Sequence, residues 1–199
     1  MVWDTKSNSP KPIQVFSEAK DTISCISIQG HEIISGSTDG RVRRYDLRTG
    51  QVTTDVLGYP VTSISRTKDG QALLVTLLAS RSVLLDLSTG VVLKTYGDKG
   101  FSNQELRLRS TFAANEGVVV CGSESGDGEG GGEGGKGGEI FAWDVLSGEL
   151  VARLRHGEGM GKDGVVGVVA WTDGRGRGSG GWWVSGGSDG VVKIWGENG

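Results

Sequence analysis

Short apolar or alternating segments recur along the whole chain, and turn residues separate them. Segments of this length that are rich in β-branched and aromatic residues predict β-strands. The segment 102–110, SNQELRLRS, comes nearest to a helical pattern, but nine residues are too few for a stable helix by themselves. The expected strands cover residues 22–28, 32–37, 41–46, 51–56, 61–66, 72–77, 82–86, 91–95, 106–112, 118–121, 140–144, 150–154, 165–171, 182–185 and 191–195. The pattern therefore predicts an all-β chain.

The third strand of each unit ends on nearly the same residues, and a similar fragment stands at the start of the chain. An aromatic residue or Leu stands before Asp or Gly each time, 42, 40, 58 and 52 residues apart, at Trp3, Tyr45, Leu85, Trp143 and Trp195. The first two intervals match the period of roughly 40–45 residues that propeller blades show. The last two intervals are longer because Gly-rich insertions interrupt the units.

A lone four-stranded sheet that is apolar on both faces is not stable in water, so such units must stack on one another. We expect a single array over residues 1–199, with a stub at 1–16 and blades at about 17–57, 58–96, 97–155 and 156–199. The last unit has only three strand segments. Two arrangements are open: a small ring closed by pairing 13–16 with 191–195, or an open arc whose exposed edges invite self-association. The open arc is the expected one.

The insertion at 126–138, GDGEGGGEGGKGG, has nine glycines and is expected to be a flexible hairpin tip. It contains formal matches to G-x-G-x-x-G, for example at Gly126, Gly128 and Gly131. A phosphate-binding loop needs a helix behind it, and no helix can be read here. A nucleotide-binding enzyme that uses this loop is therefore the least favoured of the function classes.

The composition narrows the function further. A net charge of −3 gives no electrostatic reason to expect direct nucleic-acid binding, and no apolar run is long enough to span a membrane. Cys25 and Cys121 lie in apolar strand segments and predict buried, reduced thiols, which fits the cytoplasm or the nucleus. No nucleophile and base are paired and no metal-ligand spacing occurs, so we expect no enzyme activity, no metal and no cofactor.

The period, the Ser-x-Asp-Gly turns and the aromatic-Asp ends together resemble the WD40 repeat family over essentially the whole chain. This resemblance implies a β-propeller of about four blades that forms an incomplete seven-blade ring. The positions that match the family's structural residues are Trp3, Asp4, Asp39, Tyr45, Asp46, Leu85, Asp86, Trp143, Asp144, Asp189 and Trp195.

The family often carries a Gly-His pair whose His joins the turn Asp and, through Ser or Thr, the Trp. The chain has two histidines, His31 in the wrong place and His156, which precedes a Gly instead of following one. We therefore expect this polar network to be absent and the blades to be held by packing.

Two segments, 39–51 and 102–108, are similar to WD repeat scaffolds that organise a mitogen-activated protein kinase cascade and are also associated with the spliceosome. The resemblance implies a non-enzymatic interaction scaffold whose partners are kinase cascade components. The alternative is a subunit of a pre-mRNA splicing complex that binds spliceosomal proteins.

Two groups of residues are candidates for partner binding. The first is a cationic cluster in and after the third strand, Arg41, Arg43, Arg44 and Arg48. A buried, unpaired guanidinium is costly, so Arg44 must either reach a carboxylate such as Asp46 or Asp55 or lie at the rim. The second group is Asn103, Gln104 and Glu105, which replace the usual Gly-His turn and serve either partner contact or loop capping.

Overall fold

The computed structural model describes residues 1–124, 138–156, 164–172 and 181–196, and within them every regular element is a β-strand. The strands are β1 (Ile23–Gln29), β2 (Glu32–Ser37), β3 (Arg41–Asp46), β4 (Val52–Val56), β5 (Val61–Arg66), β6 (Ala72–Leu77), β7 (Arg81–Asp86), β8 (Val92–Tyr96), β9 (Ser110–Ala113), β10 (Val118–Gly122), β11 (Glu139–Asp144), β12 (Leu150–Arg155), β13 (Val166–Thr172), β14 (Trp182–Gly187) and β15 (Val192–Gly196). The predicted all-β class is confirmed.

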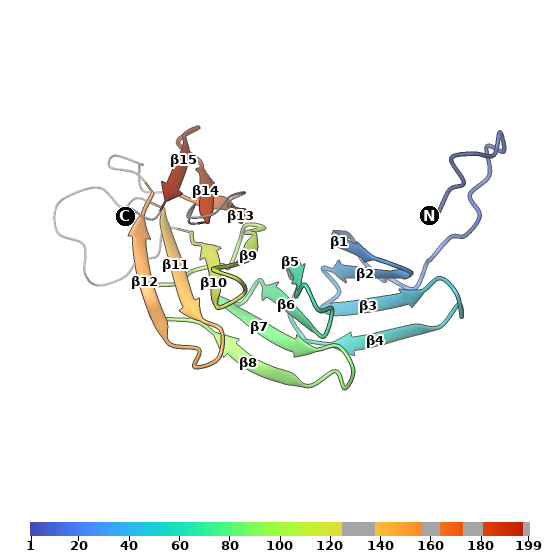
Figure 1. The fold of residues 1–199 in the computed structure, drawn as a ribbon, viewed down its shortest axis with the longest axis horizontal. Coiled ribbons are helices and arrows are strands. Elements are labelled where there is room, and N and C mark those ends of the chain that lie inside the picture. Colours follow the sequence, from blue (N-terminus) through green and yellow to red (C-terminus); the bar gives the residue numbers. More distant parts are fainter. Residues whose placement is uncertain (125–137, 157–163, 173–180, 197–199) are drawn as a thin grey trace.

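Consecutive strands form four antiparallel sheets in chain order, which we call the first to fourth blades. The first three blades are β1–β4, β5–β8 and β9–β12, and the described part of the fourth is β13–β15. Figure 1 shows the blades arranged as an open arc, with β1, β5, β9 and β13 on the concave side and β4, β8 and β12 on the outer rim. The N-terminal segment projects from one end of the arc, and β15 lies at the other end.

One predicted strand is wrong over half its length. Residues 106–112 were expected to be one strand, but β9 begins only at Ser110. The backbone N–H of Arg109 donates to the carbonyl of Gly167 in the next blade, and Leu108 is buried in the core. The apolar alternation there belongs to a loop that bridges two blades and buries Leu108, while its other side chains are exposed.

Three apolar clusters lie between neighbouring blades and hold the stack together. The cluster between the first and second blades includes Ile34, Val42, Val61 and Leu85. The largest, between the second and third blades, surrounds Trp143, and a smaller one joins the third blade to the fourth. Full burial of each such side chain contributes roughly 1.5–3 kcal/mol, so face-to-face stacking is the main source of stability.

Candidate interaction surfaces

The predicted arginine cluster is divided by the alternation of β3, because successive side chains of a strand point to opposite faces. Arg43 lies on the face turned away from the second blade and is 2% exposed. Its Nη2 lies 2.7 Å from Oδ2 of Asp39, and the backbone N–H of Lys20 donates to the same oxygen at 3.0 Å. Arg43 is therefore used inside the first blade.

This ion pair changes the acidity of its carboxyl group. Hydrogen bonds from the Arg43 guanidinium hold the pKa of Asp39 down at about 2, and Asp39 in turn raises the pKa of Arg43. Asp39 is also a predicted structural position of the turn before β3. In the first blade, an arginine thus satisfies the carboxylate that a histidine satisfies in the family pattern.

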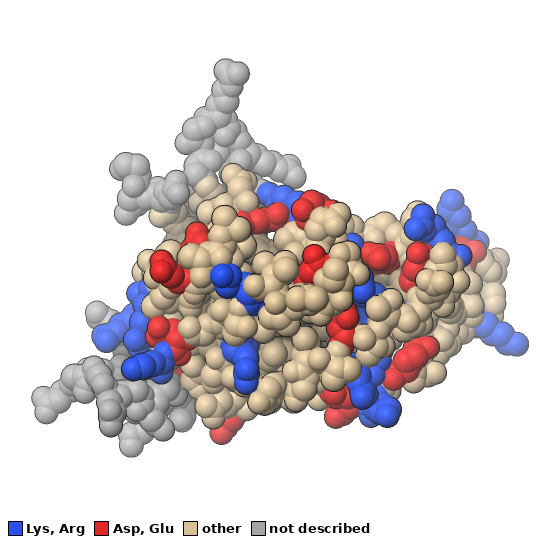
Figure 2. All heavy atoms as spheres, turned by 90° about the horizontal axis from the view of Figure 1, so that it is seen from below, with Lys and Arg blue, Asp and Glu red and all other residues tan. Residues whose placement is uncertain are grey.

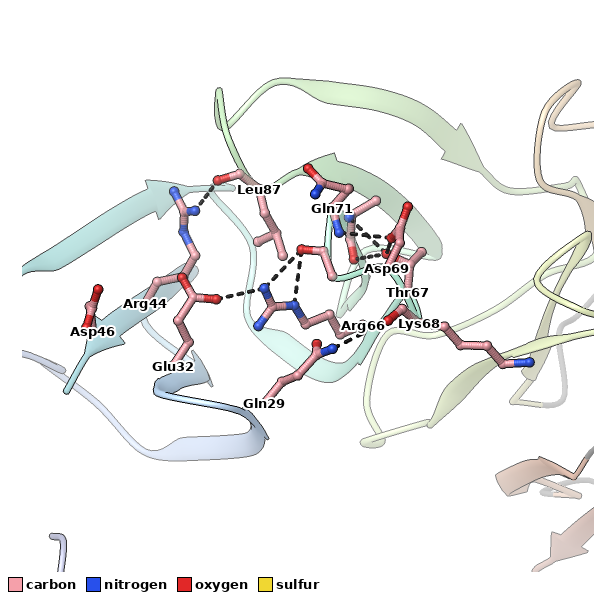
Figure 3. A network of polar contacts seen from close by, with 12 residues as sticks. Gln29, Glu32, Arg44, Asp46, Arg66, Thr67, Lys68, Asp69, Gln71 and Leu87 are labelled. Atoms are coloured by element: carbon pink, nitrogen blue, oxygen red, sulfur yellow. Dashed lines mark hydrogen bonds and ion pairs between the residues drawn. The ribbon is translucent and has the colours of Figure 1, made fainter. Parts of the chain in front are cut away.

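Arg44 lies on the opposite face of β3 and points to the second blade, as Figure 3 shows. Its Nη1 donates to the carbonyl of Leu87, and its Nε lies 3.8 Å from Oδ2 of Asp55. Of the two carboxylates proposed from the sequence, Asp55 is the partner. The guanidinium joins two blades and is mostly buried.

A second arginine completes this polar seam between the first two blades (Figure 3). Arg66 pairs with Glu32 at 2.7 Å and donates to the carbonyl of Gly70 at 2.9 Å. The side chain of Gln29 donates to the carbonyl of Lys68 at 3.4 Å. The contacts of Arg66 with Glu32 and of Gln29 with Lys68 join the two blades, so the seam is structural.

The two remaining arginines of the cluster lie at opposite ends of β3. Arg41 begins the strand, whereas Arg48 follows it in the next turn and pairs loosely with Asp46 at 3.5 Å. A strand of six residues spans roughly 20 Å. The structure therefore does not bring the four arginines together as one docking patch. A partner role for Arg41 and Arg48 stays a prediction.

Asn103 anchors the second candidate group to the second blade and is fully buried. Its backbone exchanges hydrogen bonds with Ser80, and its side-chain Nδ2 donates to the carbonyl of Leu77 at 3.1 Å. These contacts fix the start of the loop rather than offering Asn103 to a partner.

Gln104 and Glu105, in contrast, are exposed on a loop whose backbone is fixed by hydrogen bonds to Glu124. The carboxylate of Glu124 accepts hydrogen bonds from the backbone N–H groups of Gln104, Glu105 and Leu106 at 2.9, 3.0 and 2.6 Å. Three donors around one carboxylate form an anion-binding backbone concavity. We call residues 104–106 the braced loop.

The braced loop lies on the side of the arc where the turns before β3, β5 and β7 also lie, which we call the loop face. Hydrogen bonds connect these turns: Leu57 to Gly40, and Ser80 to Asn103. On this face the guanidinium of Arg81 sits 4.7 Å above the ring of the exposed Tyr59. Tyr59 and Arg81 were not among the site residues predicted from the sequence. The available signal was an aromatic residue in the turn 57–60, outside every strand.

Charge on the outer rim offers no comparable surface. Figure 2 views the molecule from below and shows basic and acidic side chains interspersed there, without an extended area of one sign. Such a mixed surface produces little long-range electrostatic steering.

The expectation that the polar network is absent is wrong for the fourth blade. The indole Nε1 of Trp195 donates to Oγ of Ser185 at 2.8 Å, and Nδ1 of His156 lies 2.7 Å from the same oxygen. Nε2 of His156 lies 3.2 Å from the carbonyl of Val191 and 3.6 Å from Oδ1 of Asp189. His156 is fully buried. The order of His and Gly in the sequence misled the prediction, because the position of the imidazole depends on the fold of the loop.

The other signature positions use packing. Trp143 stacks on Phe141 with ring centroids 5.7 Å apart, and Leu85 is fully buried. Tyr45 lies under Phe16, with ring centroids 4.3 Å apart. Trp3 is exposed on the N-terminal stub.

The aspartates that follow the signature residues close the next turn. Asp86 accepts the backbone N–H groups of Ser88 and Thr89, both at 2.8 Å. Together with the hydroxyl of Ser88, which is the largest cause, these contacts lower the pKa of Asp86 to about 2. Asp46 and Asp144 accept turn N–H groups in the same way, and their pKa values are also lowered. Asp4 similarly accepts the N–H of Lys6.

One feature predicted from the sequence lies almost wholly beyond the described residues. The Gly-rich insertion 126–138, with its formal phosphate-loop matches, is outside them except for Gly138. The described ranges contain no group of three or more metal-ligating side chains and no helix that could cross a membrane.

Four-stranded antiparallel sheets that stack face to face around a common concave side define a β-propeller arrangement. No protein-family model matches the chain. A computationally designed protein, Ika4, has a crystal structure that aligns with a TM-score of 0.64 at 20% identity, over 92% of this chain and 96% of that one, which supports the fold alone.

The sequence relatives specify the family. The chain is 40% identical to WD repeat domain-containing protein 83 of Rattus norvegicus over 78% of its own length and 45% of the relative. It is also 40% identical to an uncharacterized WD repeat-containing protein of Schizosaccharomyces pombe, over 70% of this chain and 42% of that protein. The chain is a WD40 repeat protein, and it spans about half the length of the curated relatives it matches.

Proposed function

We propose that the chain is a non-enzymatic protein-interaction scaffold that organises components of a mitogen-activated protein kinase cascade, in the cytoplasm or the nucleus. The WD repeat relatives support the scaffold role in this proposal. The kinase cascade rests on the resemblance of segments 39–51 and 102–108 to scaffolds of that class.

One observation carries the choice of the docking site. The braced loop is exposed at its side chains while its backbone is fixed by Glu124 on one side and Asn103 on the other. A loop that is already ordered loses little conformational entropy when a partner binds. Tyr59 and Arg81 lie on the same loop face and add an aromatic and a cationic group, residue types that are enriched in binding hot spots.

The test is binding of a purified mitogen-activated protein kinase and its upstream kinase to the immobilised chain. The double substitution Gln104→Ala with Glu105→Lys should reduce binding at least tenfold without changing the melting temperature. Leu146→Lys, at an exposed turn after β11, is the matched control and should bind normally. Equal binding by both variants would contradict the site, and capture of spliceosomal proteins instead of the kinases would favour the splicing-complex alternative.

A further inference from the structure

A glycine in the second strand of the first and third blades makes room for the next blade, whereas Thr76 holds this position in the second blade. At Gly36 in β2, an added Cβ would lie 2.5 Å from Cγ1 of Val61, and at Gly122 in β10 it would collide with the backbone of Val166. Val61 and Val166 are the first residues of the inner strands β5 and β13, and both are completely buried. The glycine therefore allows the inner strand of the following blade to approach closely.

The fourth blade keeps this glycine at the same register. Gly36 pairs with Val42, Gly122 with Ile140, and Gly186 of β14 pairs with Val192. Around Gly186, however, no described atom lies within 4 Å of an added Cβ. The position is shaped for a following inner strand, yet none of the described residues occupies it.

The side chains around Gly186 have the composition of an internal blade face. We call this the terminal face; its members are Val168, Ala170, Trp182, Val184, Gly186, Val192 and Ile194. Val192 and Ile194 are 72% and 65% exposed, whereas Ile140, at the position of Val192 in the third blade, is 1% exposed. The set contains no charged residue.

The opposite end of the arc carries the matching half of a blade contact. Ile23 begins β1, and a register shift follows it, as one follows Val61 in β5 and Val166 in β13. Ile23 is 39% exposed, and Ile26 and Ile28 on the same strand are more exposed still. Ile23 thus holds the position whose counterparts fill the space above Gly36 and Gly122.

We propose that a second copy of this chain docks head to tail on the terminal face, with its Ile23 above Gly186. This contact would continue the stacking that already joins the blades within one chain. The segment 13–16 of the second copy leads into the first blade, where Phe16 packs on Tyr45, and it exposes Ile13 and Val15. Docking would bring this segment beside β15 as the fourth strand of the last blade.

The curvature of the arc favours a pair rather than a longer chain of copies. Two arcs joined at one end bring their free ends toward each other, because both curve in the same sense (Figure 1). A head-to-tail contact closes when the rotation of the stack allows it and otherwise extends into a filament. A two-copy assembly goes beyond the scaffold role proposed above, since that role does not require it.

The experiment is sedimentation equilibrium of the 199-residue chain and of two variants, one for each end. The wild-type protein should form a species of twice its 20.9 kDa mass at concentrations up to roughly 100 µM. Gly186→Val should be monomeric but fold normally, because its new side chain meets no described atom. Ile23→Lys should be monomeric through loss of the other half of the contact. Leu146→Lys, far from both ends, should remain a dimer.

Mixing the two monomeric variants distinguishes head-to-tail docking from symmetric pairing. Gly186→Val retains a normal Ile23 end, and Ile23→Lys retains a normal terminal face, so the mixture should form a heterodimer through one intact contact. Circular dichroism and thermal unfolding check that both variants are folded. A monomeric wild type, a dimeric Gly186→Val, no association in the mixture, or open-ended growth of the wild-type species would each overturn the proposal.

Discussion

The third and fourth blades each have a tryptophan near the end of their third strand, Trp143 and Trp195, and hold it in different ways. In the fourth blade, Trp195 donates to Ser185, which is also bonded to the buried His156. In the third blade, Cys121 stands at the position of Ser185, and no described residue offers a hydrogen-bond partner to Nε1 of Trp143. Trp143 is instead surrounded by Phe101, Phe141 and Tyr96.

The difference shows what the polar network adds. Trp143 lies in a large apolar cluster between two complete sheets and is fully buried, so packing alone fixes it. Trp195 is only half-buried and lies in a sheet of three described strands, where less apolar surface is available. The hydrogen bonds of His156 and Ser185 compensate for weaker packing there.

The largest expected effect is at the packed position. Trp143→Ala should lower the free energy of unfolding by about 3–5 kcal/mol, because it opens a cavity among the aromatic rings. Trp182→Ala, at a half-exposed tryptophan of the terminal face, should cost much less in the monomer. Urea unfolding of both variants measures the difference, and equal losses would contradict the central role of the Trp143 cluster.

The next effect tests the polar network. His156→Ala should cost about 2–3 kcal/mol, because it leaves the buried hydroxyl of Ser185 with one partner fewer and removes a buried ring. His31→Ala is the matched control at the exposed histidine and should change stability by less than about 0.5 kcal/mol. Thermal unfolding of the two variants decides, and a neutral His156→Ala would show that the network does not stabilise the blade.

The arginine that replaces the histidine in the first blade predicts a dependence on pH. Because the folded pKa of Asp39, about 2, lies below its ordinary value of 3.8, the pair stabilises the protein above pH 4. That stability, on the order of 2 kcal/mol, is lost as the pH falls from about 4 to 2. Urea unfolding across this range should show a steeper loss for wild type than for Asp39→Asn. Parallel curves would contradict the assignment.

A smaller effect is expected when the third blade is given the serine that the fourth blade has at this position. Cys121→Ser should give Nε1 of Trp143 an acceptor, while its hydroxyl can still donate to the carbonyl of Arg109, which the thiol now faces at 3.7 Å. We expect a gain of about 1 kcal/mol. Cys25→Ser, in a blade with no tryptophan at this position, is the control and should show no gain. A loss at Cys121→Ser would mean that apolar packing outweighs the new hydrogen bond.

The smallest effect concerns the turn between β9 and β10. Ala114, Asn115 and Glu116 all have positive φ, and Ala114 is at +49°. Ala114→Gly should stabilise the protein by up to about 1 kcal/mol, because glycine adopts this conformation without steric cost. Ala72→Gly, at the first residue of strand β6, should destabilise it. Chemical unfolding measures both, and a destabilised Ala114→Gly would contradict a strained turn.

The strand pattern could be predicted because alternation and turn chemistry are local. The observed bounds of β2, β3, β5 and β6 are the predicted ones, because turns that contain Gly, Asp or Ser separate these strands. The segment 106–109 could not be placed in this way, because Leu108 is buried by another blade and not by a strand neighbour.

The candidate sites were harder to read because a side chain's role depends on which face it occupies. Arg43 and Arg44 are adjacent in sequence, yet one closes a turn with Asp39 and the other reaches Leu87 in the next blade. Glu124, which braces the loop 104–106, stands about 20 residues from it in sequence. His156 lies 29 residues from Ser185, so the network could be recognised only after the loop was folded.

The most direct test of the claim that the fourth blade carries a WD40-type polar network is the nuclear magnetic resonance spectrum of the indole N–H groups. The chain has six tryptophans, and each gives one such signal. In Ser185→Ala, the Nε1–H signal of Trp195 should shift and exchange faster with solvent, while that of Trp143 should stay in place. An unchanged Trp195 signal would contradict the account.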